Sequence, residues 1–271
     1  MKNASPANGR APRLSSLRAA LLLLAGSDGR VNAHDGRWVR LMWVWLGLLG
    51  VAWGLLVACV WAGASAALPW WGPGGGLPLA PAAALVALFC LTPLHRPVLA
   101  VARQLRPACP GGQATAAAGL LAVLALCLLW IVPYYRGRTS LPAWLAWARP
   151  MAEYRLLVLM PIWGAWAMMV PGHFCPPAEG ANPLLRTFLK RQPVGGTALW
   201  MAIPLAGTLW ELNFMGGWTS LPTGLALAAG GIGGVLLCRA RGGVTRDALL
   251  AANWLTQMAV LVGYLAAKSH T

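Results

Sequence analysis

A glycine pair followed by a polar run is the part of this sequence best suited to binding an anion. Gly242 and Gly243 lead into Val-Thr-Arg-Asp and then into an apolar stretch that we expect to be helical. The first backbone N–H groups of a helix lack partners within it, and beyond a Gly-Gly turn they can bind phosphate. The same residues also have a structural interpretation, in which Thr245 caps the helix and Asp247 lies favourably in its first turn. Composition alone favours the structural interpretation.

Carboxylates, which are the ligands that Mg²⁺ prefers, are scarce in this chain. Only six of the 271 residues are acidic. Two of them, Glu179 and Asp247, fall in separate polar segments between apolar stretches, where together they would hold a metal ion weakly. We therefore assign no metal ligands from the sequence.

Two histidines, His95 and His173, stand at the ends of apolar stretches. A histidine at such a position is more often a hydrogen-bonded structural group, and the less favoured alternative is axial ligation of a tetrapyrrole metal. The six cysteines show no paired spacing, so the sequence indicates neither a zinc knuckle nor a disulfide framework.

The elements that must position these residues are apolar helices. Hydrophobic residues make up 58% of the chain and charged residues 10%, more apolar surface than a soluble domain of this size can bury. Because roughly 20 apolar residues cross the hydrocarbon layer as a helix, we predict an all-α, polytopic membrane helix bundle with about seven transmembrane helices. The predicted spans are residues 41–67, 76–94, 116–134, 155–171, 196–215, 220–238 and 248–267. A shorter apolar segment, 141–148, is predicted to be interfacial or re-entrant.

The distribution of Lys and Arg predicts the orientation of these spans. With the N-terminus in the cytoplasm, most of the 21 basic residues lie inside, in the N-terminal segment and in the connections 95–115, 172–195 and 239–247. We therefore predict a multi-pass protein of a bacterial inner (plasma) membrane. Topology and contact with the lipid bilayer account for the net charge of +15, so no nucleic-acid partner is expected.

The remaining sequence signals are structural. Residues 1–16 are predicted to be a disordered basic N-terminus, and 17–268 a single membrane-embedded domain. The apolar run after Arg18 resembles a short signal-peptide core, but an uncleaved interfacial helix is favoured. Tryptophans near the predicted helix ends form belts that anchor them at headgroup level. The glycine-rich residues 229–234 favour close helix packing over a phosphate loop.

Three short motifs, taken in order, resemble the cobalamin synthase family, whose members are adenosylcobinamide-GDP ribazoletransferases of the membrane. Residues 242–252 resemble the family's G-G-x-T-G-D-x-L-G-A, residues 176–180 its A-R-x-E-G, and residues 91–95 its L-T-G-x-H. Length and span order agree over about residues 17–267. The resemblance implies a cytoplasm-facing site that joins α-ribazole to adenosylcobinamide-GDP, with Mg²⁺ if the enzyme is active. The substrate-binding residues that it implies are His95, Glu179, Gly180, Gly242, Gly243, Thr245 and Asp247.

The departures from that family pattern concern catalysis. The family continues after its histidine as L-D-G-L-A-D-x-x-D-G, and a helix would place these three aspartates on one face, where they can hold Mg²⁺ against a diphosphate. The corresponding residues here are Pro97, Val101 and Gln104. Arg246 also replaces a glycine, and Gln257 stands where the family has a glutamate. No catalytic residue is therefore assigned, and whether the chain is an enzyme stays open at this point.

Two functional hypotheses follow from the resemblance and the departures. The first is a divergent ribazoletransferase. The second, which the lost aspartates favour, is a non-catalytic structural or ligand-binding subunit of a membrane complex, with protein partners or a homo-oligomer. A transporter is disfavoured because no ionisable residue lies at the centre of a span.

Overall fold

The computed structural model describes residues 12–25, 41–67, 79–91, 95–105, 110–135, 152–213 and 220–268. Within these ranges the chain is helical apart from turns and one isolated β-bridge, which confirms the all-α fold class. The helices up to residue 135 are α1 (Pro12–Ala25), α3 (Met42–Ala67), α4 (Leu79–Leu91), α5 (His95–Leu105) and α6 (Pro110–Tyr135). Those after it are α7 (Ala152–Ala167), α8 (Pro171–Phe174), α9 (Pro183–Arg191), α10 (Val194–Asn213), α11 (Ser220–Leu227), the π-helix η2 (Ala228–Gly233), α12 (Gly234–Ala240) and α13 (Arg246–Lys268).

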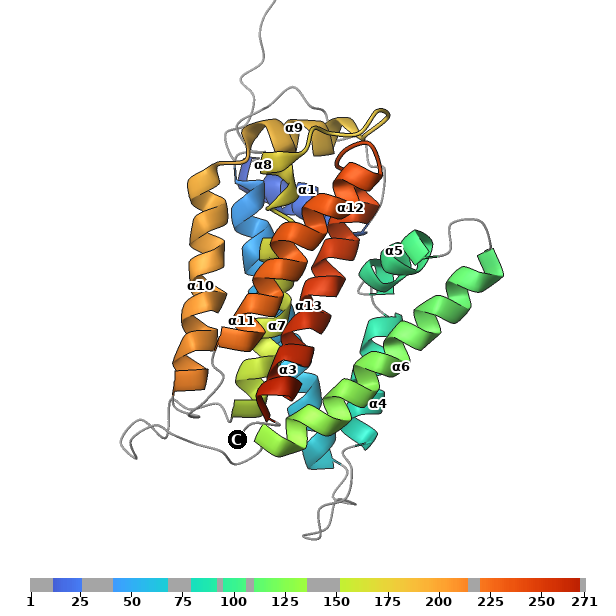
Figure 1. Cartoon of the computed structure of the whole chain (residues 1–271), viewed down its shortest axis with the longest axis vertical. Helices are drawn as coiled ribbons and strands as arrows, with labels where there is room; N and C mark the ends of the chain where they lie inside the picture. The colour runs from blue at the N-terminus through green and yellow to red at the C-terminus, as the bar shows by residue number, and fades with distance from the viewer. Residues whose placement is uncertain are drawn as a thin grey trace, which may run out of the picture.

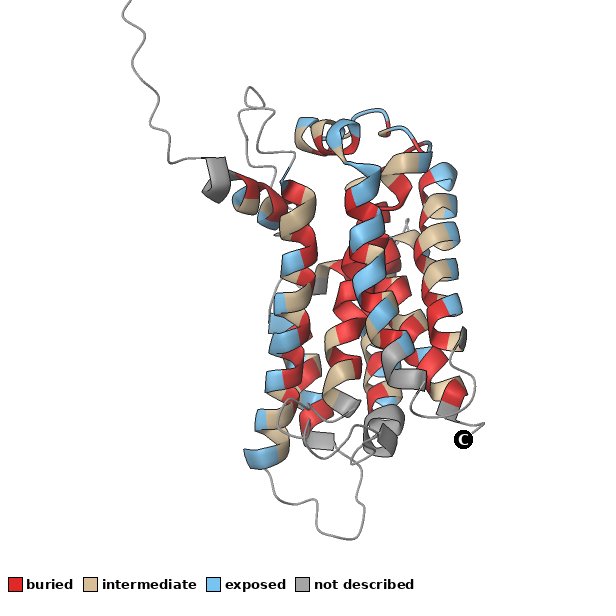
Figure 2. Ribbon diagram, turned by 90° about the vertical axis from the view of Figure 1, so that its left-hand side faces the viewer, coloured by how far each residue is buried: buried red, intermediate tan, exposed pale blue. Residues whose placement is uncertain are grey.

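Helices α7 and α13 form the centre of the bundle (Figure 1). Helices α3 and α10 pack on α7, whereas α5, α6 and the continuous α11–η2–α12 segment pack on α13. The outer helices bury one side and expose an apolar side (Figure 2). This pattern is expected where lipid covers the outer surface, because apolar side chains need no burial there.

Four helical segments in the described part of the chain are long and apolar enough to cross a membrane. They are Met42–Ala67, Tyr154–Phe174, Leu221–Ala240 and Arg246–Ala267, and the bent pair Pro81–Leu91 and Arg96–Leu105 would make a fifth. Each of the seven predicted stretches contains a helix within its described residues, but the length and composition of these helices support about seven spans only in part. The 13 residues of α4 rise about 20 Å, less than the roughly 30 Å of a hydrocarbon layer.

Small residues bring the helices into close contact at two places. A Cβ atom on Gly54 of α3 would lie 2.5 Å from the Val158 carbonyl oxygen of α7, and one on Gly50 would lie 2.7 Å from the Ala165 Cβ atom. Their spacing is the G-x-x-x-G pattern of closely packed membrane helices. In η2, a Cβ atom on Gly230 would lie 2.7 Å from the Trp166 ring. The predicted packing role of residues 229–234 is thus confirmed.

Two of the predicted connections are not irregular loops. Residues 95–105 form α5, and the 172–195 connection contains α9, which lies across one end of the bundle (Figure 1). Both helices are amphipathic, and each alone is too short and too charged to cross a membrane. In α9 the buried side chains are Leu185, Phe188 and Leu189, at helical spacing.

The N-terminal prediction is corrected in part. Helix α1 begins at Pro12, so the end of the segment predicted to be disordered is helical. The predicted helix after Arg18 is present, and the Trp45 indole of α3 donates a hydrogen bond to the Ser16 hydroxyl at 2.9 Å. The interfacial segment 141–148 and residues 1–11 lie outside the described residues.

Candidate anion-binding pocket

Two motif segments that the fifth and sixth predicted spans separate in the sequence lie side by side. Pro177 and Val244 form a parallel β-bridge, in which the Val244 N–H donates to the Pro176 carbonyl at 2.7 Å. The Ala178 N–H donates to the Val244 carbonyl at 3.1 Å. Residues 176–180 and 242–247 therefore form one rigid edge at the N-terminus of α13.

Gly243 makes this pairing geometrically feasible. Its φ angle is +138°, a conformation that L-residues with a side chain rarely adopt. A Cβ atom at this position would lie 2.7 Å from both the backbone nitrogen and the Cα atom of Ala178. The glycine is required by the approach of the second backbone, independently of any ligand.

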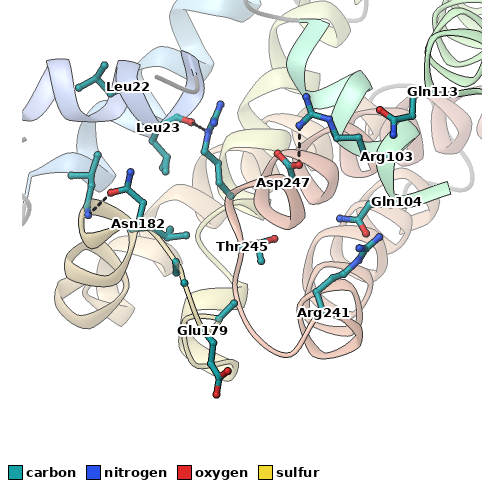
Figure 3. Close-up of a pocket in the computed structure, with 16 residues that line it drawn as sticks. Leu22, Leu23, Arg103, Gln104, Gln113, Glu179, Asn182, Arg241, Thr245 and Asp247 are labelled. Atoms are coloured by element: carbon teal, nitrogen blue, oxygen red, sulfur yellow. Dashed lines mark hydrogen bonds and ion pairs between the residues drawn. The ribbon is translucent and has the colours of Figure 1, made fainter. Parts of the chain in front are cut away.

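A pocket of about 640 Å³ lies beside this edge (Figure 3). Its wall combines residues from α1, α5, α6, the 178–185 segment, the turn after α12 and the start of α13, so all three predicted cytoplasmic connections contribute. The volume is in the range of small-molecule sites. The polar and charged lining residues are Arg103, Gln104, Gln113, Glu179, Asn182, Arg241, Thr245, Arg246 and Asp247.

Asp247 is already paired within this pocket. Its carboxylate accepts an ion-paired hydrogen bond from Arg103 of α5 at 2.9 Å (Figure 3). The two side chains are 50% and 36% exposed, so solvent screens the pair and its contribution to folding is at most about 1 kcal/mol. The pair nevertheless neutralises the carboxylate that faces the pocket.

Arg246 has a structural role that accounts for its departure from the family pattern. Its Nε donates to the Leu23 carbonyl at 2.6 Å, and a terminal nitrogen donates to the Leu24 carbonyl at 3.4 Å. These carbonyls lie in the last turn of α1, where helix carbonyls have no partner within the helix. The guanidinium therefore fixes α1 over the N-terminus of α13.

Side-chain caps fix the two helix starts at the pocket. The Ala248 N–H donates to Thr245 Oγ1 at 3.1 Å, and the Leu184 N–H donates to Asn182 Oδ1 at 2.8 Å. The predicted capping role of Thr245 is confirmed. Both caps hold a polar side chain, that of Thr245 or Asn182, at the pocket wall, and neither cap depends on a ligand.

The donor set of this pocket does not fit Mg²⁺. At the positions of the family's aspartates, Pro97 and Val101 are buried against the bundle and only Gln104 reaches the pocket. The Glu179 carboxylate points away from Asp247 and Arg103 (Figure 3). Among the described residues, no three His, Cys, Asp or Glu side chains are grouped so that they could hold a metal ion.

The predicted substrate-binding residues are thus only partly brought together. Glu179, Gly180, Thr245 and Asp247 line the pocket, whereas Gly242 and Gly243 form the adjoining turn. His95 begins α5, and the residues of that helix that line the pocket are Arg103 and Gln104, near its other end.

The pocket arginines were absent from the sequence-based site. In the sequence, Arg103 and Arg241 indicate only topology, because Lys and Arg are abundant in every predicted cytoplasmic connection, and Arg246 stands out only as the replacement of a glycine. The signal that could have found Arg103 is its place next to Gln104, one of the positions where an aspartate is missing.

His173 lies away from this pocket and is hydrogen-bonded. Its Nε2 lies 2.8 Å from Thr197 Oγ1, and the Gln192 amide donates to both Thr197 Oγ1 and the Met169 carbonyl. This network joins the α8, α9 and α10 region and agrees with the structural interpretation of His173.

No protein-family model, curated protein or solved structure matches this chain.

Proposed function

We propose that this protein is a membrane-embedded, non-catalytic relative of cobalamin synthase that binds a phosphate-bearing ligand in the pocket at the start of α13. The observation that carries the proposal is the charge of the pocket wall. The wall contains three arginines and two carboxylates, of which Asp247 is already paired with Arg103 and Glu179 points away from that pair. A planar guanidinium can bind two phosphate oxygens at once. The arginines of this pocket therefore suit a diphosphate ligand better than they suit a metal ion.

The proposal includes the membrane arrangement inferred from the sequence. The chain crosses a bacterial inner membrane seven times with its N-terminus in the cytoplasm, and the pocket opens on the cytoplasmic side. Four helices suited to spanning support this, as does the gathering of the three basic connections around one pocket. Nucleotide-linked or other diphosphate-bearing metabolites are then accessible ligands.

Fixed cations replace a metal ion in this proposal. In the family pattern, carboxylates hold Mg²⁺ and Mg²⁺ neutralises the phosphates. Here Arg241 is exposed on the pocket wall and forms no ion pair with a described residue. Arg103 exchanges Asp247 for a phosphate when a ligand enters, so binding needs no divalent cation.

The direct test is binding of inorganic diphosphate to the detergent-purified protein in EDTA, measured by calorimetry. Arg241→Gln is expected to weaken binding about tenfold, because it removes one charged hydrogen-bond partner of the phosphate. Arg186→Gln is the matched control, since Arg186 is an exposed arginine of the neighbouring α9 outside the pocket. Equal effects of the two variants would reject a specific site.

A second experiment separates binding from catalysis. The gene is expressed in a bacterial strain that lacks its own adenosylcobinamide-GDP ribazoletransferase, on medium without cobalamin. We expect no growth, because the aspartates that would hold Mg²⁺ are absent. Growth that depends on this chain would overturn the non-catalytic assignment in favour of a divergent transferase.

A further inference from the structure

A second cavity, of about 800 Å³, opens on the side of the bundle between the end of α7, α10 and the η2–α12 segment. We call it the lateral groove. Its apolar wall includes Trp166, Val170, Phe174, Met201, Ile232 and Leu236, and its polar residues are His173, Thr197 and Arg239. No residue of this groove lines the anion-binding pocket.

The groove lies between two helical segments that are long and apolar enough to cross a membrane. Two of the four candidate spans, Tyr154–Phe174 and Leu221–Ala240, form two of its sides. Three apolar side chains at its rim are strongly exposed: Phe174 at 63%, Ile232 at 65% and Leu236 at 58%. A contiguous apolar surface of this kind needs a partner in water, whereas in a membrane an acyl chain covers it.

Local backbone geometry creates the groove. Residues 228–233 form a π-helix, and its Gly231 lines the groove with nothing within 4 Å of where a Cβ atom would stand. Wide turns of this type inside α-helices recur at functional sites. The space at Gly231 is not used for helix contact, unlike that at Gly230 in the same turn.

One end of the groove is positively charged. Arg239 is exposed there and forms no ion pair with a described residue. A cation at the end of an apolar groove matches the phosphate of an anionic lipid.

We propose that the lateral groove binds one acyl chain of an anionic phospholipid, whose phosphate lies against Arg239. The groove wall then surrounds the acyl chain in place of bulk lipid, and Arg239 at the positive end favours an anionic headgroup. The site depends on membrane insertion and not on the anion-binding pocket, so it can fail while diphosphate binding stands.

Native mass spectrometry of the full chain in mild detergent tests this, with titration by phosphatidylglycerol or by phosphatidylcholine. We expect one phosphatidylglycerol to bind about fivefold more tightly than phosphatidylcholine, because one arginine near the membrane surface attracts an anionic headgroup to about this extent. Arg239→Gln should abolish the preference and leave diphosphate binding unchanged. Arg241→Gln, the matched charge control from the other pocket, should do the reverse.

A steric pair completes the design. Gly231→Leu fills the groove without striking the backbone and should reduce phosphatidylglycerol binding to the level of non-specific adducts. Gly224→Leu adds the same side chain on α11 in open space outside the groove and should bind like the wild type. Thermal unfolding by circular dichroism verifies that both variants fold. Equal binding of the two phospholipids to the wild type, or undiminished binding to folded Gly231→Leu, would overturn the proposal.

Discussion

Two arginines on the pocket wall lie at or beside positions where the cobalamin synthase motifs that the sequence resembles have a glycine or an aspartate. Arg246 takes a glycine position and uses its guanidinium to bind the last carbonyls of α1. Arg103 lies beside Gln104, at an aspartate position, and pairs with Asp247. Both contacts hold a guanidinium at the wall of the pocket.

The two glycines of the 242–247 segment give a prediction at this scale. Gly243→Ala should destabilise the fold by more than about 3 kcal/mol, because it combines an unfavourable φ with a clash against Ala178. Gly242→Ala, at φ +71° with open space around it, should cost only about 1 kcal/mol. Thermal unfolding of both variants in detergent measures the difference. Equal losses would mean that the β-bridge at Val244 does not constrain this turn.

The helices that carry the pocket are positioned by α7 and α13 rather than by the pocket itself. Helix α5 reaches the pocket because it packs along α13, and α13 lies against Gly164 of α7 through the side chains of Asn253 and Gln257. Helix α3 approaches α7 through Gly50 and Gly54. The pocket therefore depends on close helix packing at a distance from it.

A glycine pair on α3 tests that dependence. Gly54→Ile places a branched side chain where even a Cβ atom lies 2.5 Å from the Val158 carbonyl oxygen. Overpacking of this kind costs about 1–3 kcal/mol or more, so the melting temperature should fall by several degrees. Gly63→Ile on the same helix has open space and should leave the melting temperature unchanged. A stable Gly54→Ile variant would contradict the α3–α7 contact.

At the scale of the whole molecule, the lengths of the apolar runs and the scarcity of charge within them predicted the all-helical class and a helix in each of the seven apolar stretches. They could not predict α5 and α9, because these amphipathic helices lack the length of a span. The capping by Thr245 followed from local sequence alone. The Arg103–Asp247 pair could not, since it joins residues 144 positions apart and requires the packing of α5 on α13.

The proposed arrangement of seven spans would place the two ends of the chain on opposite sides of the membrane, and fusions in a bacterial host measure this. An N-terminal green fluorescent protein fusion should fluoresce, and a C-terminal alkaline phosphatase fusion should be active. The reason is that an odd number of spans with the N-terminus inside exports the C-terminus. A fluorescent C-terminal fusion would show an even number of spans and contradict the proposed topology.

Diphosphate binding by Asp247→Asn tests the central claim most directly. The substitution frees Arg103 and removes a negative charge from the pocket, so we predict about tenfold tighter binding in EDTA. It also removes a favourable charge from the first turn of α13, so the same variant should be slightly less stable, by about 0.5 kcal/mol. Binding that requires Mg²⁺ and disappears in Asp247→Asn would contradict the account, because Asp247 would then be a metal ligand.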